Sequence, residues 1–296
     1  MTSLEDKLRG WTGRSSQSEQ EHQERAERMV REAIKNHPAF GGCSLRVFAK
    51  GSYKNNTNVR SDSDVDIAVE CTECVYFDNA QPGAHTSTGS YSGDWSPTKL
   101  RSELVAALYD KFPGQVDTSG STAIRVNANT VRVDADIVPC FSYRYYFSET
   151  SWRAGTRVYK KDLSHLKNYP DQQYKNGVAK NDRTGKSYKR AVRIMKRVEN
   201  AMVDAGTHRE VPSYFVECLV YNCPDTILNR STWVETIKGV ISHIFHELEG
   251  EEPSIEPGRW LEVNEWKFLF TNSQPWTRRD ARDFAKAAWN YLGYAS

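Results

Sequence analysis

The spacing of apolar residues predicts a long amphipathic helix near the start of the chain. Met29, Val30, Ala33 and Ile34 fall on one helical face, and the positions around them are densely charged. Ser16 followed by Glu19 matches the capping box that opens many helices, and the sequence therefore predicts that this helix opens the fold.

Alternation of apolar and polar residues predicts two strands further along, at residues 45–49 and 65–69. Residues 78–96 are rich in Gly, Ser, Thr, Asn and Asp, which is typical of a loop. A helix is expected over 97–112, because Pro stands at its first turn and Ser96 can cap it.

Two more alternating runs, at 123–128 and 131–140, predict a hairpin. The segment from about 145 to 186 is polar, aromatic and irregular. A segment of this length is too long for a simple connection in a compact domain. We therefore expect a binding loop there.

The second half of the chain is dominated by helical spacing. The expected helices lie near 187–204, 213–222, 231–249 and 277–292. These elements predict an α+β protein, divided into a mixed lobe at 1–165 that includes the long N-terminal helix and a helical lobe at 166–296.

Composition narrows the classes of partner. With 40 basic and 38 acidic residues the formal net charge is +2, which gives no global electrostatic argument for binding duplex nucleic acid. Six unevenly spaced cysteines and the lack of a leading apolar segment argue against a secreted disulfide scaffold. No run reaches the roughly 20 apolar residues that cross a bilayer, so we expect a soluble cytoplasmic protein without membrane contact.

Candidate chemistry is concentrated in three aspartates. Asp64 and Asp66 share one strand face, and two neighbouring carboxylates are most simply explained by a bound cation. Asp136 supplies a third carboxylate if its strand lies beside theirs, and Asp134, on the same face, is the competing choice. All-oxygen ligands suit two Mg²⁺ or Mn²⁺ ions, which commonly serve phosphoryl transfer.

Gly51 and Ser52 end the first strand ahead of these acids. A tight turn there would expose backbone N–H groups and a hydroxyl to phosphate oxygens. An acidic surface turn after an ordinary hairpin is the alternative reading, but the ordered set of Gly-Ser, Asp-x-Asp and a later strand Asp favours a functional site.

The ordered motifs closely resemble those of the CD-NTases, the bacterial relatives of cyclic GMP-AMP synthase and oligoadenylate synthase, and their order and spacing are similar to clade E of that family. The matching segments are Gly51–Asp66, Ala135–Cys140, Asn168–Pro170, Asn176–Gly177, Tyr188–Lys189 and Pro212–Cys218.

The resemblance implies a polymerase-beta-like nucleotidyltransferase lobe, a helical oligoadenylate-synthase-like lobe, and nucleotides bound in a cleft between them. It also implies cyclic dinucleotide synthesis from NTPs, with the product activating an effector protein in antiphage defence. Asp136, rather than Asp134, stands in the family's Ala-Asp-hydrophobic-hydrophobic context and so takes the role of third carboxylate.

A basic helical face supports this reading from the residues themselves. Lys189, Arg193 and Lys196 fall at helical spacing on one face, which by itself is also typical of a solvated surface. The resemblance assigns Lys196 and Ser213 to the triphosphate and Tyr214 to base stacking, with Lys189 and Arg193 as weaker candidates.

The expectation about which nucleotide base is recognised depends on Asn168. In clade E an asparagine at this position is associated with uracil recognition, and a carboxamide can both donate to and accept from the imide edge of uracil. The alternative is that Asn168 caps the turn at Tyr169-Pro170. The sequence hypothesis is a uridine-containing product, cyclic UMP-AMP or cyclic di-UMP, made with UTP and ATP as the expected substrates.

Three alternatives remain from the sequence. The enzyme makes a purine-only cyclic dinucleotide; it transfers a nucleotide linearly to RNA, protein or a small molecule; or it is a catalytically silent nucleotide-binding module. The chain lacks the zinc-bearing Cys/His element of the animal DNA-sensing relative, so no requirement for duplex DNA is expected.

Overall fold

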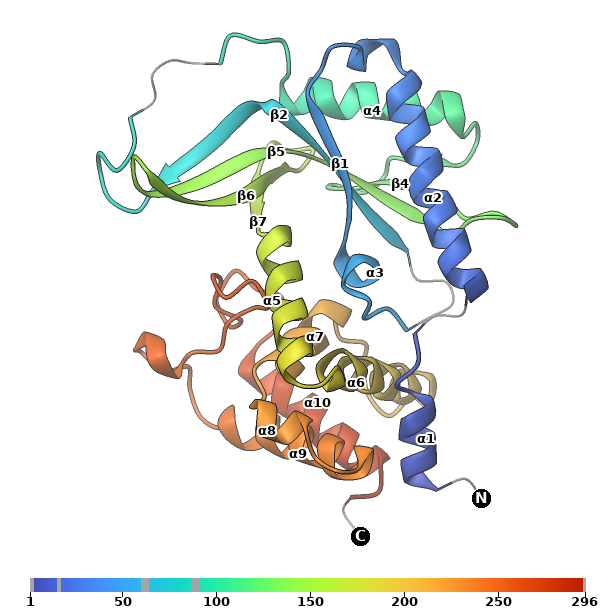
Figure 1. The fold of residues 1–296 in the computed structure, drawn as a ribbon, viewed down its shortest axis with the longest axis vertical. Helices are drawn as coiled ribbons and strands as arrows, with labels where there is room; N and C mark the ends of the chain where they lie inside the picture. The colour runs from blue at the N-terminus through green and yellow to red at the C-terminus, as the bar shows by residue number, and fades with distance from the viewer. Residues whose placement is uncertain (1–2, 15–16, 60–63, 87–90, 295–296) are drawn as a thin grey trace. The chain divides into compact units, whose positions relative to one another are not determined.

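The computed structural model describes residues 3–14, 17–59, 64–86 and 91–294 (Figure 1). The chain folds into two compact units. The helical unit contains Met1–Ser15, Lys54–Val59 and Asp171–Ser296, and the sheet unit contains Ser16–Tyr53 and Arg60–Pro170.

The sheet unit is built on one mixed sheet, which has seven strands among the described residues. The strands are β1 (Leu45–Lys50), β2 (Val65–Asn79), β3 (Val116–Asp117), β4 (Ile124–Val126), β5 (Ala135–Ser148), β6 (Ser151–Tyr159) and β7 (His165–Asn168). Their order is β1-β2-β5-β4-β3, and β6 pairs with both β5 and β7. The central pair β2 and β5 is parallel, with Asp66 opposite Asp136.

One face of the sheet is covered by α2 (Gln17–Asn36) and α4 (Pro97–Lys111), whose apolar sides bury residues such as Ile67 and Ile137 (Figure 1). A short 3₁₀ turn, Pro38–Phe40, follows α2. Both predicted helices are therefore confirmed. The proposed cap Ser16 lies outside the described residues.

Ser96 caps α4 as expected, since its Oγ accepts a hydrogen bond from the Lys99 backbone N–H at 3.2 Å. On the opposite face of the sheet, a small cluster of apolar side chains is formed by Ala68, Val138, Cys140 and Val158.

The expectation of an irregular binding loop at about 145–186 is wrong. β5 continues to Ser148, β6 and β7 follow, and α5 covers Pro170–Arg183. The alternation of β6 is faint: Trp152, Ala154 and Val158 alternate with polar neighbours, but Gly155 and Thr156 interrupt the pattern, and only Thr156 and Val158 are buried. Backbone pairing with the long β5, from Cys140 opposite Val158 onward, defines β6 instead.

The helical unit surrounds its own apolar core. Its helices are α1 (Leu4–Gly10), α5, α6 (Ser187–Asp204), α7 (Ser213–Tyr221), α8 (Asp225–Leu228), α9 (Trp233–Glu247) and α10 (Arg278–Tyr291), with a 3₁₀ turn at Glu256–Gly258. The four helices expected from the sequence are confirmed near their predicted bounds. No helix in the described part of the chain is long and apolar enough to cross a membrane.

The N-terminal residues pack with this helical core, although the sequence-based division groups them with the mixed lobe. Leu8 is fully buried in the core, and the Glu5 carboxylate accepts hydrogen bonds from the backbone N–H groups of Trp233 and Val234, at 3.2 and 2.9 Å. These contacts explain why Met1–Ser15 belongs to the helical unit.

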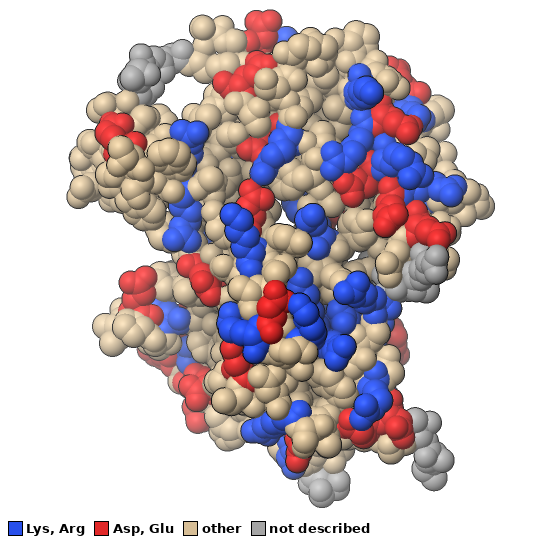
Figure 2. Space-filling model, in the orientation of Figure 1, with Lys and Arg blue, Asp and Glu red and all other residues tan. Residues whose placement is uncertain are grey.

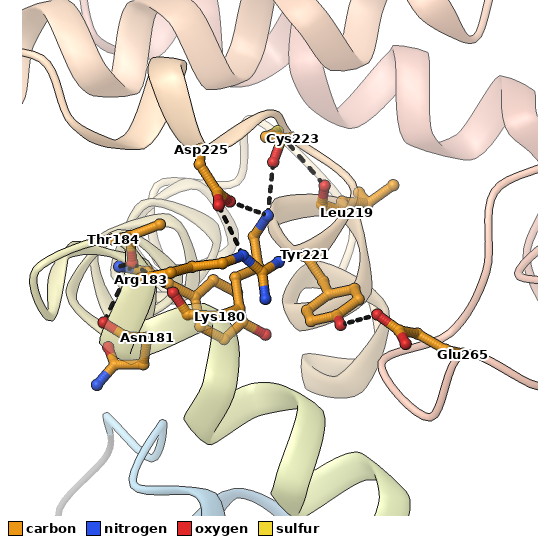
Figure 3. Close-up of polar contacts among 10 residues, drawn as sticks. Lys180, Asn181, Arg183, Thr184, Leu219, Tyr221, Cys223, Asp225 and Glu265 are labelled. Carbon is orange, nitrogen blue, oxygen red and sulfur yellow. Dashed lines mark hydrogen bonds and ion pairs between the residues drawn. The ribbon is translucent and has the colours of Figure 1, made fainter.

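A buried lysine joins α5 to the turn between α7 and α8 (Figure 3). The Nζ of Lys180 donates to the Cys223 carbonyl at 2.8 Å and to Asp225 Oδ1 at 2.9 Å. Arg183 Nε donates to the other carboxylate oxygen of Asp225 at 2.6 Å. Burial opposes ionisation of Asp225, but the hydrogen bonds from the two cations hold its pKa below the usual value.

Lys and Arg side chains are interspersed with Asp and Glu over the face drawn in Figure 2. This distribution agrees with the near balance of charges in the sequence. Any recognition of a nucleotide must therefore come from local groups of side chains.

Candidate active site

Two of the three candidate acids are direct neighbours on the sheet. Asp66 in β2 and Asp136 in β5 are opposite each other in the parallel pairing, and Asp64 comes one residue before β2 begins. Because neighbouring residues in register point to the same side, the two strand carboxylates share the face opposite α2 and α4.

The surroundings of Asp64 and Asp136 disfavour their charge. Burial raises the pKa of Asp64 to about 6; Arg125 opposes this rise, and the nearby carboxylates add to it. Burial also raises the pKa of Asp136, again against the attraction of Arg125. Acids that are partly removed from water and crowded together are suited to an added cation.

Two basic residues that sequence reasoning missed lie at this cluster. Arg125 Nη2 is 3.3 Å from Asp64 Oδ1, and Lys50 Nζ is 3.5 Å from Asp66 Oδ1. Pairing explains both placements, since Lys50 is opposite Asp66 and Arg125 is opposite Asp136. Among the described residues, no three His, Cys, Asp or Glu side chains form a group already arranged to hold a metal ion.

Asp134, the competing acid, has local partners. Its Oδ2 accepts a hydrogen bond from Arg125 at 2.6 Å, and its Oδ1 accepts one from the Ala128 backbone N–H. It precedes β5, which begins at Ala135. Asp134 therefore orients Arg125 and the chain before the strand, and these contacts favour Asp136 as the third acid.

Gly51 is in direct contact with the cluster. Its φ is +67°, and a Cβ atom placed on it would lie 2.1 Å from Asp66 Oδ2. Only glycine combines ready access to a positive φ with the lack of a Cβ atom that would overlap Asp66. The sequence predicted a tight turn here; the structure has a short helix, α3 (Gly51–Asn55), with Ser52 as its half-buried second residue.

Asn168 ends β7 on the same sheet. It is opposite Thr156 of β6, which in turn is opposite Ser142 of β5. Alternate residues of a strand point to the same face, so Ser142 lies on the face of Asp136 in β5. Paired residues also share a face, and the Asn168 side chain therefore projects from the face that carries the acids. No described residue hydrogen-bonds its carboxamide, so the turn-capping alternative has no contact in this structure.

In the helical unit, Lys196 is buried rather than presented to solvent. Its Nζ lies 3.5 Å from Glu217 Oε2 and 3.2 Å from Thr57 Oγ1, and Thr57 donates to the same Glu217 oxygen at 2.8 Å. Burial lowers the pKa of Lys196, and the Glu217 carboxylate opposes that effect.

Arg193 and Lys189, on the same helix, have different surroundings. Arg193 donates from Nε to the Thr12 carbonyl and from Nη1 to the Asn56 carbonyl, both at 2.7 Å, so it fastens two chain segments to α6. Lys189 Nζ lies 5.8 Å from the centre of the exposed Tyr174 ring. Burial lowers the pKa of Lys189.

Ser213 and Tyr214 open α7. Ser213 is exposed, whereas Tyr214 is half-buried and its hydroxyl donates to Glu262 Oε2 at 3.1 Å. The roles given to these residues and to Lys196 by resemblance stay predictions.

Comparison with known proteins identifies the family. Residues 175–293 match the family model described as the cGAS/DncV-like nucleotidyltransferase C-terminal helical domain. The chain is 34% identical to the cyclic dipyrimidine nucleotide synthase CdnE of Legionella pneumophila, over 97% of both proteins. It is 33% identical to the cyclic dipurine nucleotide synthase of Elizabethkingia meningoseptica, over 99% of this chain and all of the other.

Solved structures agree with these matches. The CdnE c-UMP-AMP synthase of Rhodothermus marinus, solved with Apcpp and Upnpp, superposes with a TM-score of 0.85 at 26% identity, covering 100% of this chain and 98% of the other. The Elizabethkingia meningoseptica CdnE with GTP and Apcpp gives 0.81 at 32% identity, covering 99% and 100%. The predicted α+β fold and clade E resemblance are thus confirmed: the chain is a nucleotidyltransferase of the CD-NTase family and belongs to its CdnE group.

Proposed function

We propose that this protein joins NTPs into a uridine-containing cyclic dinucleotide, cyclic UMP-AMP or cyclic di-UMP, which acts as a second messenger in bacterial antiphage (CBASS) signalling. The observation that carries the uridine assignment is Asn168, whose carboxamide lacks a hydrogen-bond partner among the described residues and shares a sheet face with the acids. UTP, with ATP as the second substrate for the mixed product, is the proposed substrate.

Overall similarity to relatives does not select the base. Proteins named for dipyrimidine and dipurine products are 34% and 33% identical to this chain. Base choice must therefore depend on few residues. The Asn168 carboxamide can donate one hydrogen bond to the imide edge of uracil and accept another from it. A base with a different edge would leave polar groups of the site unpaired and would therefore bind less well.

The acid cluster is proposed to hold a pair of divalent cations. Asp64 and Asp66 would hold both Mg²⁺ or Mn²⁺ ions and Asp136 one of them, because these carboxylates are crowded, partly buried and hard in ligand character. Such ions, when bound, supply positive charge at the α-phosphate and lower the pKa of the attacking hydroxyl. Proton binding at Asp64, whose pKa is raised to about 6 in the absence of an ion, would compete with these ions as the pH falls.

Other residues of the chain position the nucleotides. Backbone at Gly51 and the Ser52 hydroxyl are proposed to contact phosphate oxygens beside Asp66. In the helical unit, Lys189, Lys196 and Ser213 are proposed to contact triphosphate and Tyr214 to stack on a base. For Lys196 this role requires that its buried ion pair with Glu217 loosen when the nucleotide binds.

One set of acids would serve two successive bond formations. In the first, the acceptor hydroxyl attacks the α-phosphorus of the donor and pyrophosphate leaves. The linear intermediate then reorients, and its remaining hydroxyl attacks its own α-phosphorus with loss of a second pyrophosphate. Both steps are nucleotidyl transfers, so a single site suffices.

The test is incubation of the purified protein with Mg²⁺ or Mn²⁺ and four NTPs, each labelled in turn, followed by phosphatase and mass analysis. A phosphatase-resistant product labelled by UTP supports the proposal. A resistant product labelled only by purines removes the uridine assignment, and a phosphatase-sensitive product indicates linear transfer.

The matched inactive control carries Asp64→Asn and Asp66→Asn. It should keep the fold and lose pyrophosphate release by at least about 100-fold, because the ligands of the proposed ions are gone. Near-normal release from this variant would contradict the assignment of the acids. Nucleotide binding without turnover by the unmodified protein would favour the silent-module alternative.

A further inference from the structure

We propose that Gly155 is a specificity-determining position, because its missing side chain allows the Asn168 backbone to approach and so sets where the Asn168 carboxamide meets a base. This inference rests on the role proposed above for Asn168. It concerns a residue that touches no substrate and acts by positioning Asn168.

The contact at Gly155 is unusually close. A Cβ atom placed there would lie 2.6 Å from the backbone carbonyl oxygen of Asn168, and 3.0 Å from two ring carbons of Tyr169. Backbone cannot yield as a flexible side chain can, so any larger residue at 155 must displace the end of β7. Gly155 does not have a positive φ, so this requirement is steric rather than conformational.

The residues on either side of Asn168 are anchored on the opposite face of the sheet. Lys167 forms an ion pair with Asp78, and its Nζ lies 5.4 Å from the centre of the Tyr143 ring. The buried Tyr169 ring meets the same Tyr143 ring edge-on, with centroids 6.3 Å apart.

Tyr143 itself is fixed. Its hydroxyl donates to Asp78 Oδ2 at 2.6 Å, and in the β5–β6 pairing it is opposite Gly155. Alternation along β7 sends Lys167 and Tyr169 to this anchored face and Asn168 to the face of the acids. The carboxamide is thus free to bind a ligand on a backbone that is held on both sides.

A held backbone matters because the proposed recognition is geometric. Hydrogen bonds weaken steeply when donor and acceptor move by several tenths of an ångström or lose alignment. A shift of the Asn168 backbone would therefore break at least one of the two bonds to uracil, while the acids on β2 and β5 stay in register.

The experiment compares Gly155→Ala, Asn168→Ala and the double variant with the unmodified protein and with Gly10→Ala, whose added Cβ meets nothing within 4 Å. The readout is the ratio of uridine to adenosine incorporated into the phosphatase-resistant product when UTP and ATP are both supplied (the UTP/ATP ratio), with melting temperature as the measure of folding. Gly155→Ala should lower the UTP/ATP ratio about tenfold or more, and Gly10→Ala should leave it unchanged.

The double variant separates positioning from a general structural effect. If Gly155 acts through Asn168, the double variant should match Asn168→Ala alone. Additive losses, or a Gly155→Ala protein that keeps the parental ratio while Asn168→Ala loses it, would overturn the inference and leave the proposed function standing. An unchanged ratio in Asn168→Ala would remove the uridine assignment, and the inference would fail with it.

Should Gly155→Ala fail to fold, Tyr143→Phe provides the test. This change removes only the hydroxyl that donates to Asp78. It is expected to lower the UTP/ATP ratio severalfold in the same direction, with kcat for the preferred substrate pair largely kept. A ratio equal to that of the parent would count against the anchored face.

Discussion

At the scale of single residues, the approach of Gly51 to Asp66 makes a sharp prediction. Gly51→Ala should lower kcat at least about 100-fold, because the new Cβ would overlap Asp66 Oδ2 and displace a carboxylate of the cluster. The strain of a positive φ should also lower the free energy of unfolding by about 1 kcal/mol.

The control for that strain is Gly42→Ala. Gly42 also has a positive φ, of +86°, but a Cβ there meets nothing within 4 Å. It should lose similar stability and keep full activity. Equal loss of activity in both variants, measured by pyrophosphate release, would show that strain rather than displacement of Asp66 is responsible.

The raised pKa of Asp64 makes a prediction about stability. Its pKa is about 6 in the folded protein and near 3.8 when unfolded, so the ionised form disfavours folding above pH 6, and this cost disappears as the pH falls through 6 towards 3.8. In chelator-treated protein, Asp64→Asn should therefore be more stable than the parent at pH 7.5, and the difference should shrink at pH 5.

Denaturant unfolding at the two pH values measures this difference. Asp110→Asn, at an exposed position, is the control and should change stability little at either pH. An Asp64→Asn variant that is equally stabilised at both pH values would show that the effect does not come from this ionisation.

The sequence predicted the acids and the glycine of the cluster but not its two basic side chains. Asp-x-Asp spacing and a Gly-Ser pair are local patterns, so they can be found along the chain. Lys50 and Arg125 meet the acids only through pairing between strands that are far apart in sequence. The burial of Lys196 against Glu217 was likewise out of reach, since helical spacing alone predicts an open basic face.

At the scale of elements, helices were easier to predict than strands. α2, α6, α9 and α10 each bury one apolar side, which leaves a strong periodic signal. β6 leaves only a faint signal because Gly155 and Thr156 interrupt its alternation, and β7 is only four residues long. Their positions are determined by backbone pairing, of β6 with β5 and of β7 with β6. The candidate base-reading residue therefore lay in a segment that the sequence predicted to be irregular.

The contact of α5 with the α7–α8 turn predicts a stability effect. Asp225→Ala would leave Lys180, which is 4% exposed, without its carboxylate partner. The free energy of unfolding should fall by about 3 kcal/mol, as when one partner of a buried ion pair is removed. Because the pKa of Asp225 is lowered in the folded protein, this contribution is present above pH 3.8 and is lost as the pH falls below it.

The matched control is Asp182→Ala. It removes an exposed ion pair between Asp182 and Lys186, which are four residues apart in sequence near the end of α5. An exposed pair contributes at most about 1 kcal/mol, so this variant should unfold almost like the parent. If the two variants lose equal stability in urea titrations, the buried lysine is not the cause.

At the scale of the whole molecule, the helical unit is discontinuous in sequence. Its core includes Leu8, and its buried Lys196–Glu217 pair is completed by Thr57. The segment that matches the helical family model, 175–293, contains neither contribution. The chain therefore passes between the two units several times, and neither unit is a separable block of sequence.

A fragment of residues 171–296 should accordingly fail to fold cooperatively by itself. It would expose the site of Leu8 and leave the buried ion pair without the Thr57 hydroxyl. Near-ultraviolet circular dichroism and thermal unfolding of the fragment, compared with the full chain, provide the measurement. A sharp melting transition with native side-chain signals would show that the unit is autonomous.

The separation of Asn168 from the acids also bears on how such enzymes diversify. The acids belong to β2 and β5 at the centre of the sheet, whereas Asn168 ends β7 at its edge. If Asn168 selects the base as proposed, a substitution on this edge strand would change the base built into the messenger while β2 and β5 stay paired in register. A lineage would then change its messenger by few substitutions at one edge of the sheet, with the acids on β2 and β5 unaltered.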